Sequence, residues 1–328
     1  MSDSHPNDIE TGREIPGGGR PTRAEVRRRR RVKRRRVTGA VAAGAVLAGA
    51  AASCTARWLR PSDGGTPTAP TRQATASAPA PRGSVDLASA LAPVTSVLGT
   101  GKMSVALLDP QSNRWAGYGR GIFDTASIVK VDILSTLLLQ AQDAGRDLTA
   151  RQRSLATAMI ENSDNEATSA LWATIGKASA LDKANARLGL RETTGGDGTV
   201  WGLTQTTALD QVRLLTAVFG DRSPLHSAAR SYIQHLMYHI APDQDWGVSV
   251  AADPGRPTAL KNGWLQRSQS SKWDINSIGR IEKDGRVFYL AVLLNGSSTQ
   301  EMGIKLVEKA ARSATEALAR TPTARVTS

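Results

Sequence analysis

The composition of the chain changes near residue 84, and this change confines the folded part to the residues that follow. Residues 60–84 are mostly Pro, Thr, Ala, Ser and Gly, a composition that cannot form a core and is typical of a partly extended linker. From residue 85 to about residue 320, apolar residues recur at helix and strand spacings. The 328 residues therefore predict one domain of ordinary size, N-terminal appendages and a flexible C-terminus at residues 321–328.

The positive charge of the chain lies in an appendage and not in the domain. Residues 1–83 hold 16 Lys or Arg and 6 Asp or Glu, a balance of +10 out of +13 for the whole chain. Most of it is a basic run at residues 27–36, which ends a polar tail (residues 1–36) that we expect to be disordered and cytoplasmic. Because the domain is close to neutral, no nucleic-acid partner is expected; nucleic-acid binding by the tail alone is the alternative.

A membrane segment is expected directly after the basic run. Residues 37–53 carry no charge and are mostly Ala, Val, Gly and Leu, a pattern typical of a positive-inside anchor or a signal sequence. Cys54, the only cysteine, excludes an intrachain disulfide and ends a stretch that resembles a lipoprotein cleavage box. We expect residues 37–59 to be a single anchor in the cell membrane, with lipidation at Cys54 or signal cleavage and secretion as alternatives. Each places the domain outside the cytoplasm.

Within the domain, the sequence predicts helices and strands in an α+β arrangement. Asp284-Gly285 is expected to form a tight hairpin turn. Helices are expected at residues 85–98, 127–144, 148–160, 167–175, 181–188, 208–219, 227–240 and 300–318, and strands at residues 102–109, 114–118, 258–263, 273–281 and 286–294.

Ser127 and Lys130 lie where a loop meets an apolar helix. Their spacing puts both side chains on one face of the helix. A serine hydroxyl becomes a good nucleophile when a base removes its proton, and a lysine amine can do this when burial lowers its pKa. Free N–H groups of the first helical turn favour negative charge near Ser127. The pair is a candidate nucleophile and base, although Ser-x-x-Lys also occurs by chance.

Two later motifs extend this pattern. Ser163 begins a Ser-Asp-Asn sequence after a helical run, and Lys261 begins a Lys-Asn-Gly sequence that enters a strand. In this order, the three motifs resemble the Ser-x-x-Lys, Ser-Asp-Asn and Lys-Thr-Gly motifs of class A β-lactamases and penicillin-binding proteins. The resemblance covers about residues 85–318.

The resemblance implies both a fold and a chemistry. The fold is a five-stranded antiparallel sheet flanked by helices, with an all-α subdomain. The chemistry is that of a serine hydrolase, in which Ser127 attacks a β-lactam carbonyl and Lys130 takes the proton. Ser163 passes a proton to the leaving nitrogen, and Lys261 holds the substrate carboxylate. The residues implied in substrate binding are Asn165, Asn262, Gly263 and Trp264. The backbone N–H of Trp264 is implied to form an oxyanion hole together with the backbone N–H of Ser127.

The residue that would release the acyl group is left open by the sequence. Residues 190–206 take the place of the Ω loop, in which class A enzymes carry a glutamate that activates water. Glu192 is the candidate deacylating base, but Gly196 stands where the family has an asparagine, so a solvated loop carboxylate is the alternative. Asn262 also replaces the usual Thr or Ser of the third motif and removes a hydroxyl that helps to bind the carboxylate.

Three functions remain compatible with these motifs. The first is hydrolysis of β-lactams, and the second is a penicillin-binding or D-Ala-D-Ala peptidase activity on peptidoglycan. The third is a non-catalytic domain that binds the cell wall. No cofactor is implied and a monomer is expected. His235 and His239 have a spacing that can hold zinc, but no third ligand is evident, so no metal is expected.

Overall fold

The computed structural model describes residues 84–320 of the chain. The predicted tail, the membrane segment with Cys54 and residues 321–328 lie outside the described residues. Among residues 84–320, no helix has the length and apolar character needed to cross a bilayer. In the same range, no group of three or more His, Cys, Asp or Glu side chains could hold a metal ion.

A six-stranded sheet forms the centre of the fold. The five predicted antiparallel strands are confirmed, and a short sixth strand runs parallel to its neighbour at one edge. The order across the sheet is β1 (Val85–Asp86), β3 (Arg114–Tyr118), β2 (Lys102–Asp109), β8 (Arg286–Ser297), β7 (Trp273–Lys283) and β6 (Ala259–Gln266).

The prediction of one helix over residues 85–98 is wrong at its start. Val85 and Asp86 pair with β3 as strand β1, and α2 (Ala88–Thr95) follows. The Ala88 N–H donates to Asp86 Oδ1 at 2.8 Å. A carboxylate that accepts from the first turn favours the start of a helix after it, so the chain changes from strand to helix at this residue.

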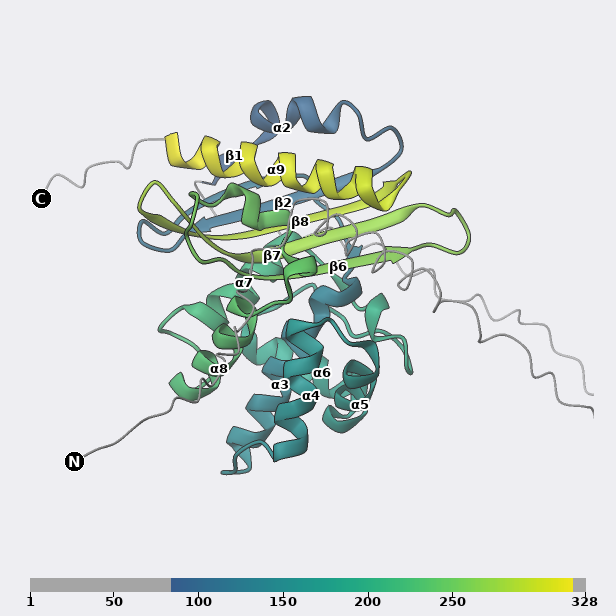
Figure 1. The fold of residues 1–328 in the computed structure, drawn as a ribbon, viewed down its shortest axis with the longest axis vertical. Coiled ribbons are helices and arrows are strands. Elements are labelled where there is room, and N and C mark those ends of the chain that lie inside the picture. The colour runs from purple at the N-terminus through teal and green to yellow at the C-terminus, as the bar shows by residue number, and fades with distance from the viewer. Residues whose placement is uncertain (1–83, 321–328) are drawn as a thin grey trace, which may run out of the picture. The chain divides into compact units, whose positions relative to one another are not determined.

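Helices cover both faces of the sheet (Figure 1). On one face, α2 and α9 (Gln300–Arg320) pack against an apolar cluster that includes Leu290. On the other face lie the remaining helices, which share a second cluster. They are α3 (Val129–Asp143), α4 (Ala150–Glu161), α5 (Asn165–Ile175), α6 (Lys177–Leu188), α7 (Ala208–Phe219) and α8 (Ser227–Tyr238).

The N-terminal ends of α4 and α5 are fixed by capping side chains. Thr149 and Gln152 form a capping box at the start of α4, and Asp164 Oδ1 accepts from the Ala167 N–H at 2.7 Å at the start of α5. Each cap satisfies N–H groups that have no partner within the helix. Ser163 lies in the turn between the two helices with a φ of 55°, so its left-handed backbone is held by structure on both sides.

A separate two-stranded sheet joins two distant segments of the chain. Strand β4 (Phe123–Asp124) pairs with β5 (Gln205–Thr206), and the Thr125 N–H donates to Thr204 O at 2.8 Å. Short 3₁₀ helices lie next to each strand, η1 (Ala126–Ile128) after β4 and η2 (Trp201–Leu203) before β5. This pairing holds the loop at residues 190–206 against the start of α3.

Candidate active site

The candidate nucleophile, Ser127, lies in η1, immediately before α3. Its side chain is half-buried, and the preceding Ala126 has a φ of 47°. A non-glycine residue in the left-handed region is strained and persists where the surroundings impose it. The turn therefore holds Ser127 in a fixed position at the N-terminus of an apolar helix.

Strand β6 passes directly against this turn. A Cβ atom at Gly263 would lie 2.7 Å from Thr125 O and 2.8 Å from the Ser127 backbone N. Such contacts leave no room for a side chain, so glycine allows the edge strand to reach the nucleophile. Trp264 follows on the same strand, which places its backbone beside the Ser127 turn.

Lys130 and the Ser-Asp-Asn motif lie in direct contact in the structure. The Lys130 Nζ donates to Ser163 O at 2.7 Å, to Ser163 Oγ at 3.1 Å and to Asn165 Oδ1 at 2.9 Å. The lysine is fully buried. Burial lowers its pKa to about 7, against the opposing effect of the Asp164 carboxylate. A large fraction of this amine is therefore neutral at neutral pH and able to accept a proton.

Lys261 reaches the same serine from the sheet. Its Nζ donates to Ser163 Oγ at 2.9 Å and to Asn262 O at 3.0 Å. Burial, and then the positive charge of Lys130, hold the pKa of Lys261 well below its usual value. Ser163 Oγ thus lies between two lysine nitrogens and accepts from both, so its own proton can be donated to a further group.

An indole ring covers this cluster on the loop side. The Lys130 Nζ lies 5.0 Å from the centre of the Trp201 ring, and the Trp201 Nε1–H donates to Ser169 Oγ at 3.1 Å. Trp201 belongs to η2, the part of the loop that packs against η1. The sequence analysis missed this residue, because its position depends on the pairing of β4 with β5.

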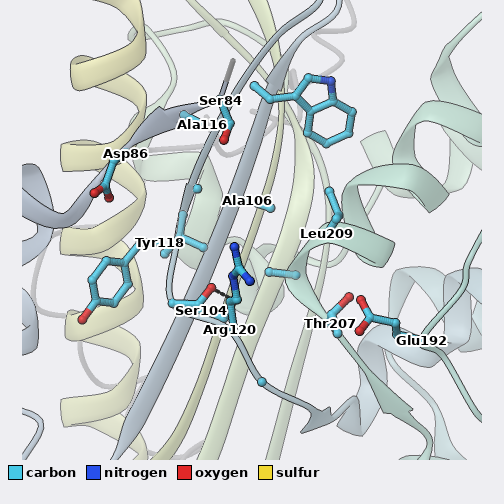
Figure 2. Close-up of a pocket in the computed structure, with 16 residues that line it drawn as sticks. Ser84, Asp86, Ser104, Ala106, Ala116, Tyr118, Arg120, Glu192, Thr207 and Leu209 are labelled. Atoms are coloured by element: carbon cyan, nitrogen blue, oxygen red, sulfur yellow. Dashed lines mark hydrogen bonds between the residues drawn. The ribbon is translucent and has the colours of Figure 1, made fainter. Parts of the chain in front are cut away.

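Glu192 is not brought to the lysine cluster. It lines a separate cavity with Arg120 and Thr207 (Figure 2), and none of the four motif lysines and serines lines that cavity. Its backbone N–H donates to Asp210 Oδ2 at 2.7 Å. The loop also closes on glycine at residue 196, since a Cβ atom there would lie 2.3 Å from Val200 O. This contact gives a physical reason why no asparagine stands at that position.

Asn262 turns away from Lys261 along β6. Its Nδ2 donates to Gln244 O at 2.8 Å and to Trp246 O at 2.9 Å. Both amide hydrogens are therefore engaged with backbone, and the side chain ties β6 to the loop before the sheet. The Trp264 ring packs on the Trp246 ring, with centroids 5.9 Å apart. The proposed contacts of the Asn262 amide and of the Trp264 N–H with a substrate stay predictions.

A buried amide on β7 holds the segment before the nucleophile, and the sequence analysis did not single it out. Asn276 Nδ2 donates to Asp124 O at 2.8 Å and to Thr125 O at 3.1 Å. Its Oδ1 accepts from the Leu294 N–H at 3.4 Å. The polar residue at an otherwise apolar strand position was the available signal, because a buried amide needs partners.

Charged side chains fasten the same segment from outside. Asp124 pairs with Arg267, which also donates through Nε to Asp274 Oδ2 at 2.6 Å. Arg267 lies in the loop between β6 and β7. The segment that precedes Ser127 is therefore held by two neighbouring strands of the large sheet and by β5.

The fold and the arrangement of the three motifs define the class of protein. The fold, an α+β sheet with a helical subdomain, is the β-lactamase and transpeptidase fold. Within it, the Ser-x-x-Lys helix lies beside the Ser-x-Asn turn and the Lys-x-Gly edge strand. The chain matches the Beta-lactamase enzyme family over residues 139–318 and belongs to it.

Solved structures of this fold superpose over most of the chain. PBP-A is 16% identical, with a TM-score of 0.61, and covers 72% of this chain and 98% of its own. The TLA-1 extended-spectrum β-lactamase is 16% identical, with a TM-score of 0.61 and coverage of 70% and 98%. A class A β-lactamase from Bacteroides cellulosilyticus DSM 14838 is 15% identical, with a TM-score of 0.60 and coverage of 70% and 97%. No curated protein matches the chain by sequence. At these identities the likeness shows the fold.

Proposed function

We propose that this protein is a serine acyl-transfer enzyme that forms a covalent acyl-enzyme with β-lactams through Ser127. One observation carries the proposal: Ser163 Oγ accepts hydrogen bonds from both buried lysines, Lys130 and Lys261. Burying two cations side by side is costly, and groups with strongly shifted pKa values concentrate at functional sites. Family membership supports the same conclusion.

The residues have distinct roles in the proposed reaction. Lys130, whose pKa is about 7, takes the proton of Ser127 as its Oγ attacks the β-lactam carbonyl. Ser163 then gives its proton to the leaving nitrogen and is reprotonated from a lysine. Lys261 keeps a positive charge near the substrate carboxylate when it is protonated. Backbone N–H groups of Ser127 and Trp264 form the oxyanion hole, where one donor contributes about 3–4 kcal/mol.

Slow release of the acyl group is part of the proposal. The carboxylate whose charge acts on Lys130 is Asp164, and its Oδ1 caps α5. Glu192 lines another cavity, and Trp201 occupies the loop side of the cluster. Neither of these two carboxylates is therefore proposed to activate water for release of the acyl group. Slow release supports a second candidate, a penicillin-binding protein that acts on the D-Ala-D-Ala end of peptidoglycan peptides. A mutant of PBP-A has been solved as an acyl-enzyme complex with penicillin G.

The decisive experiment mixes the purified chain with a chromogenic β-lactam and follows absorbance and intact mass together. A stoichiometric adduct on Ser127 with slow turnover is expected, and Ser127→Ala should abolish both signals. Ser268→Ala, at an exposed position, is the matched control. Rapid turnover without an adduct would favour a β-lactamase. Absence of both signals would favour a non-catalytic domain that binds the cell wall.

Anchoring of the domain outside the cytoplasm belongs to the same proposal. It is supported by the basic run at residues 27–36 and the uncharged run at residues 37–53. We expect the full chain to fractionate with membranes and a chain lacking residues 1–59 to be released. Cys54→Ala separates the alternatives, because it would release the protein only if a lipid on Cys54 is the anchor. A membrane-impermeant β-lactam should label Ser127 in intact cells.

A further inference from the structure

Two indole rings fasten the loop at residues 190–206 to α5. The Trp172 Nε1–H donates to Gly198 O at 2.9 Å, and the Trp201 Nε1–H donates to Ser169 Oγ at 3.1 Å. Trp172 is fully buried and anchors the loop in the core. Trp201 is half-buried and packs on the outside of the same apolar cluster. The second ring therefore lies where α5 meets the lysine cluster.

Backbone hydrogen bonds brace the segment that carries Trp201. Thr194 and Gln205 exchange two of them across the base of the loop, each at 2.9 Å. The Thr204 N–H donates to Trp201 O at 3.1 Å, and Thr204 Oγ1 accepts from the Gly196 N–H at 3.1 Å. The position of the indole is thus set by the whole loop and not by the bond to Ser169 alone.

The distance between this ring and the Lys130 amine leaves no room for water. The Nζ lies 5.0 Å from the centre of the Trp201 ring. A water molecule that hydrogen-bonds to Nζ needs about 2.9 Å, and its contact with the ring face needs about 3.5 Å more. These two contacts in line exceed the observed separation, so the ring occupies the place that such a water would take.

The ring also offers a water molecule no hydrogen bond. The Nε1–H is the only polar group of an indole, and it is engaged with Ser169 Oγ. The ring face attracts the lysine when the amine is protonated, which keeps the two groups together. Water is therefore excluded from this side of Lys130 by volume and by the lack of a partner.

The Lys130 amine is the base that this ring covers. Among residues 84–320, its three hydrogen bonds go to Ser163 and Asn165, and none goes to a carboxylate. Burial lowers the pKa of Lys130 to about 7, so the neutral amine could take a proton from water as well as from Ser127. Access of water to this amine, and not the want of a base, then limits hydrolysis.

We propose that Trp201 sets the lifetime of the acyl-enzyme by keeping hydrolytic water away from Lys130. The proposal rests on formation of the acyl-enzyme at Ser127. With the ring in place, the ester persists. With the ring removed, water fills its volume and gives a proton to Lys130 while its oxygen bonds to the acyl carbon. The bond from that carbon to Ser127 Oγ then breaks, and Oγ takes the proton back from Lys130.

Decay of the acyl-enzyme, followed by intact mass after a brief reaction of the full-length chain with a chromogenic β-lactam, tests the proposal. Trp201→Ala should speed the decay at least tenfold, since a positioned base contributes about 10²–10⁴-fold. The acylation rate, which depends on the Ser127 proton and not on water, should change less than threefold. Trp201→Phe should keep the slow decay, because a phenyl ring fills most of the same volume.

Trp115→Ala is the matched control. Trp115 is also half-buried against the same apolar cluster, but it lies on β3 and lines the cavity that contains Glu192. Its loss should leave the decay unchanged. An equal acceleration in Trp115→Ala or Trp201→Phe would show that a loosened fold, and not the space left by the indole, admits water, and would overturn the proposal.

The same experiment separates this proposal from the formation of the acyl-enzyme. An adduct with the same lifetime in the unmodified chain and in Trp201→Ala would overturn the role of Trp201 and leave acylation of Ser127 standing. Absence of an adduct and of turnover in both proteins would refute acylation itself. If Trp201→Ala does not fold, Trp201→Leu gives the same test, with an expected acceleration of threefold or more, because it leaves only part of the ring volume empty.

Discussion

Gly263 and Ser127 meet backbone to backbone: a Cβ atom on Gly263 would lie 2.8 Å from the Ser127 N. The edge strand and the nucleophile turn are therefore in direct contact, and neither can approach the other more closely. This contact sets the position of the N–H groups proposed to stabilise the oxyanion. It also explains the glycine of the third motif by the approach of two backbones.

Gly263→Ala is expected to slow acylation by about 100-fold, because a displacement near 1 Å at a catalytic centre can cost that much. Stopped-flow acylation by a chromogenic β-lactam measures the effect. Gly285→Ala, whose added Cβ atom would meet nothing within 4 Å in the β7–β8 turn, is a control for glycine loss with backbone strain alone. An acylation rate in Gly263→Ala equal to that of the unmodified chain would show that this contact does not position the nucleophile.

The rate of acylation should rise with pH and level off above about pH 7. The base must be neutral to accept a proton, and burial lowers the pKa of Lys130 to about 7. Below that pH the neutral fraction falls tenfold per unit, so the rate should fall with it. The lowered pKa of Lys261 acts in the opposite direction on substrate binding, because a neutral Lys261 no longer attracts the substrate carboxylate, so the rate is to be measured at saturating β-lactam. The two lysines titrate as a coupled pair.

Single-turnover acylation between pH 5 and 9, measured by intact mass, checks this profile on the proposed enzyme. Lys130→Arg should remove the pH-dependent rate, because a guanidinium stays protonated throughout this range. A rate that still rises steeply at pH 9 would mean that the base keeps an ordinary lysine pKa, which contradicts the buried position of Lys130.

The sequence predicted the four motif side chains because each is marked by its spacing within a motif. Ser127 and Lys130 are three residues apart on one helix, and Ser163 and Lys261 begin short motifs at element ends. The strands predicted at residues 102–109 and 114–118 agree with β2 and β3, because the turn residues between them, 110–113, mark the end of one strand and the start of the next.

The remaining features of the site depend on contacts that no local pattern encodes. Trp201 reaches Lys130 because β5 pairs with β4, and both strands are two residues long, too short for a period to appear. Glu192 faces another cavity for the same reason. Strand β1 is equally short, and its pairing with β3 is decided by tertiary structure, which overrides local preference.

Glu192→Gln should leave the rate of deacylation unchanged within twofold. The carboxylate lines the cavity beside Thr207 and Arg120, away from the lysine cluster, so it has no water to activate at the acyl group. Decay of the acyl-enzyme, followed by intact mass, measures this rate. A hundredfold longer-lived adduct in Glu192→Gln would restore Glu192 as the deacylating base.

Asp132→Asn should stabilise the folded chain at alkaline pH. Asp132 is buried on α3, and burial raises its pKa to about 8. A carboxyl group whose pKa is raised in the folded state contributes its full stabilisation of the fold below its unfolded-state pKa, near 4. This stabilisation is lost as the pH rises toward 8. The amide cannot ionise and escapes this loss.

Thermal unfolding at two pH values measures this difference. At pH 8 the melting temperature should rise by several degrees in Asp132→Asn, since about 1 kcal/mol corresponds to about 2–4 °C in a domain of this size. At pH 4 the two proteins should unfold alike. Asp197→Asn, at an exposed position, should behave as the unmodified chain at both values, and an equal gain at pH 4 and pH 8 would refute ionisation as the cause.

Asn276 should act on catalysis through the position of Ser127. Its amide donates to Asp124 O and Thr125 O, so Asn276→Asp replaces the donor by an acceptor of the same shape and leaves buried carbonyls unpaired. A buried group without its partner costs about 1–3 kcal/mol, and the melting temperature should fall accordingly. If the amide only stabilises the fold, the acylation rate of the folded fraction would be unchanged at 20 °C. We expect the acylation rate to fall at least tenfold, because the nucleophile is displaced. The concentration of β-lactam that half-saturates the enzyme should change little, because the β6 strand that would hold the substrate stays in place.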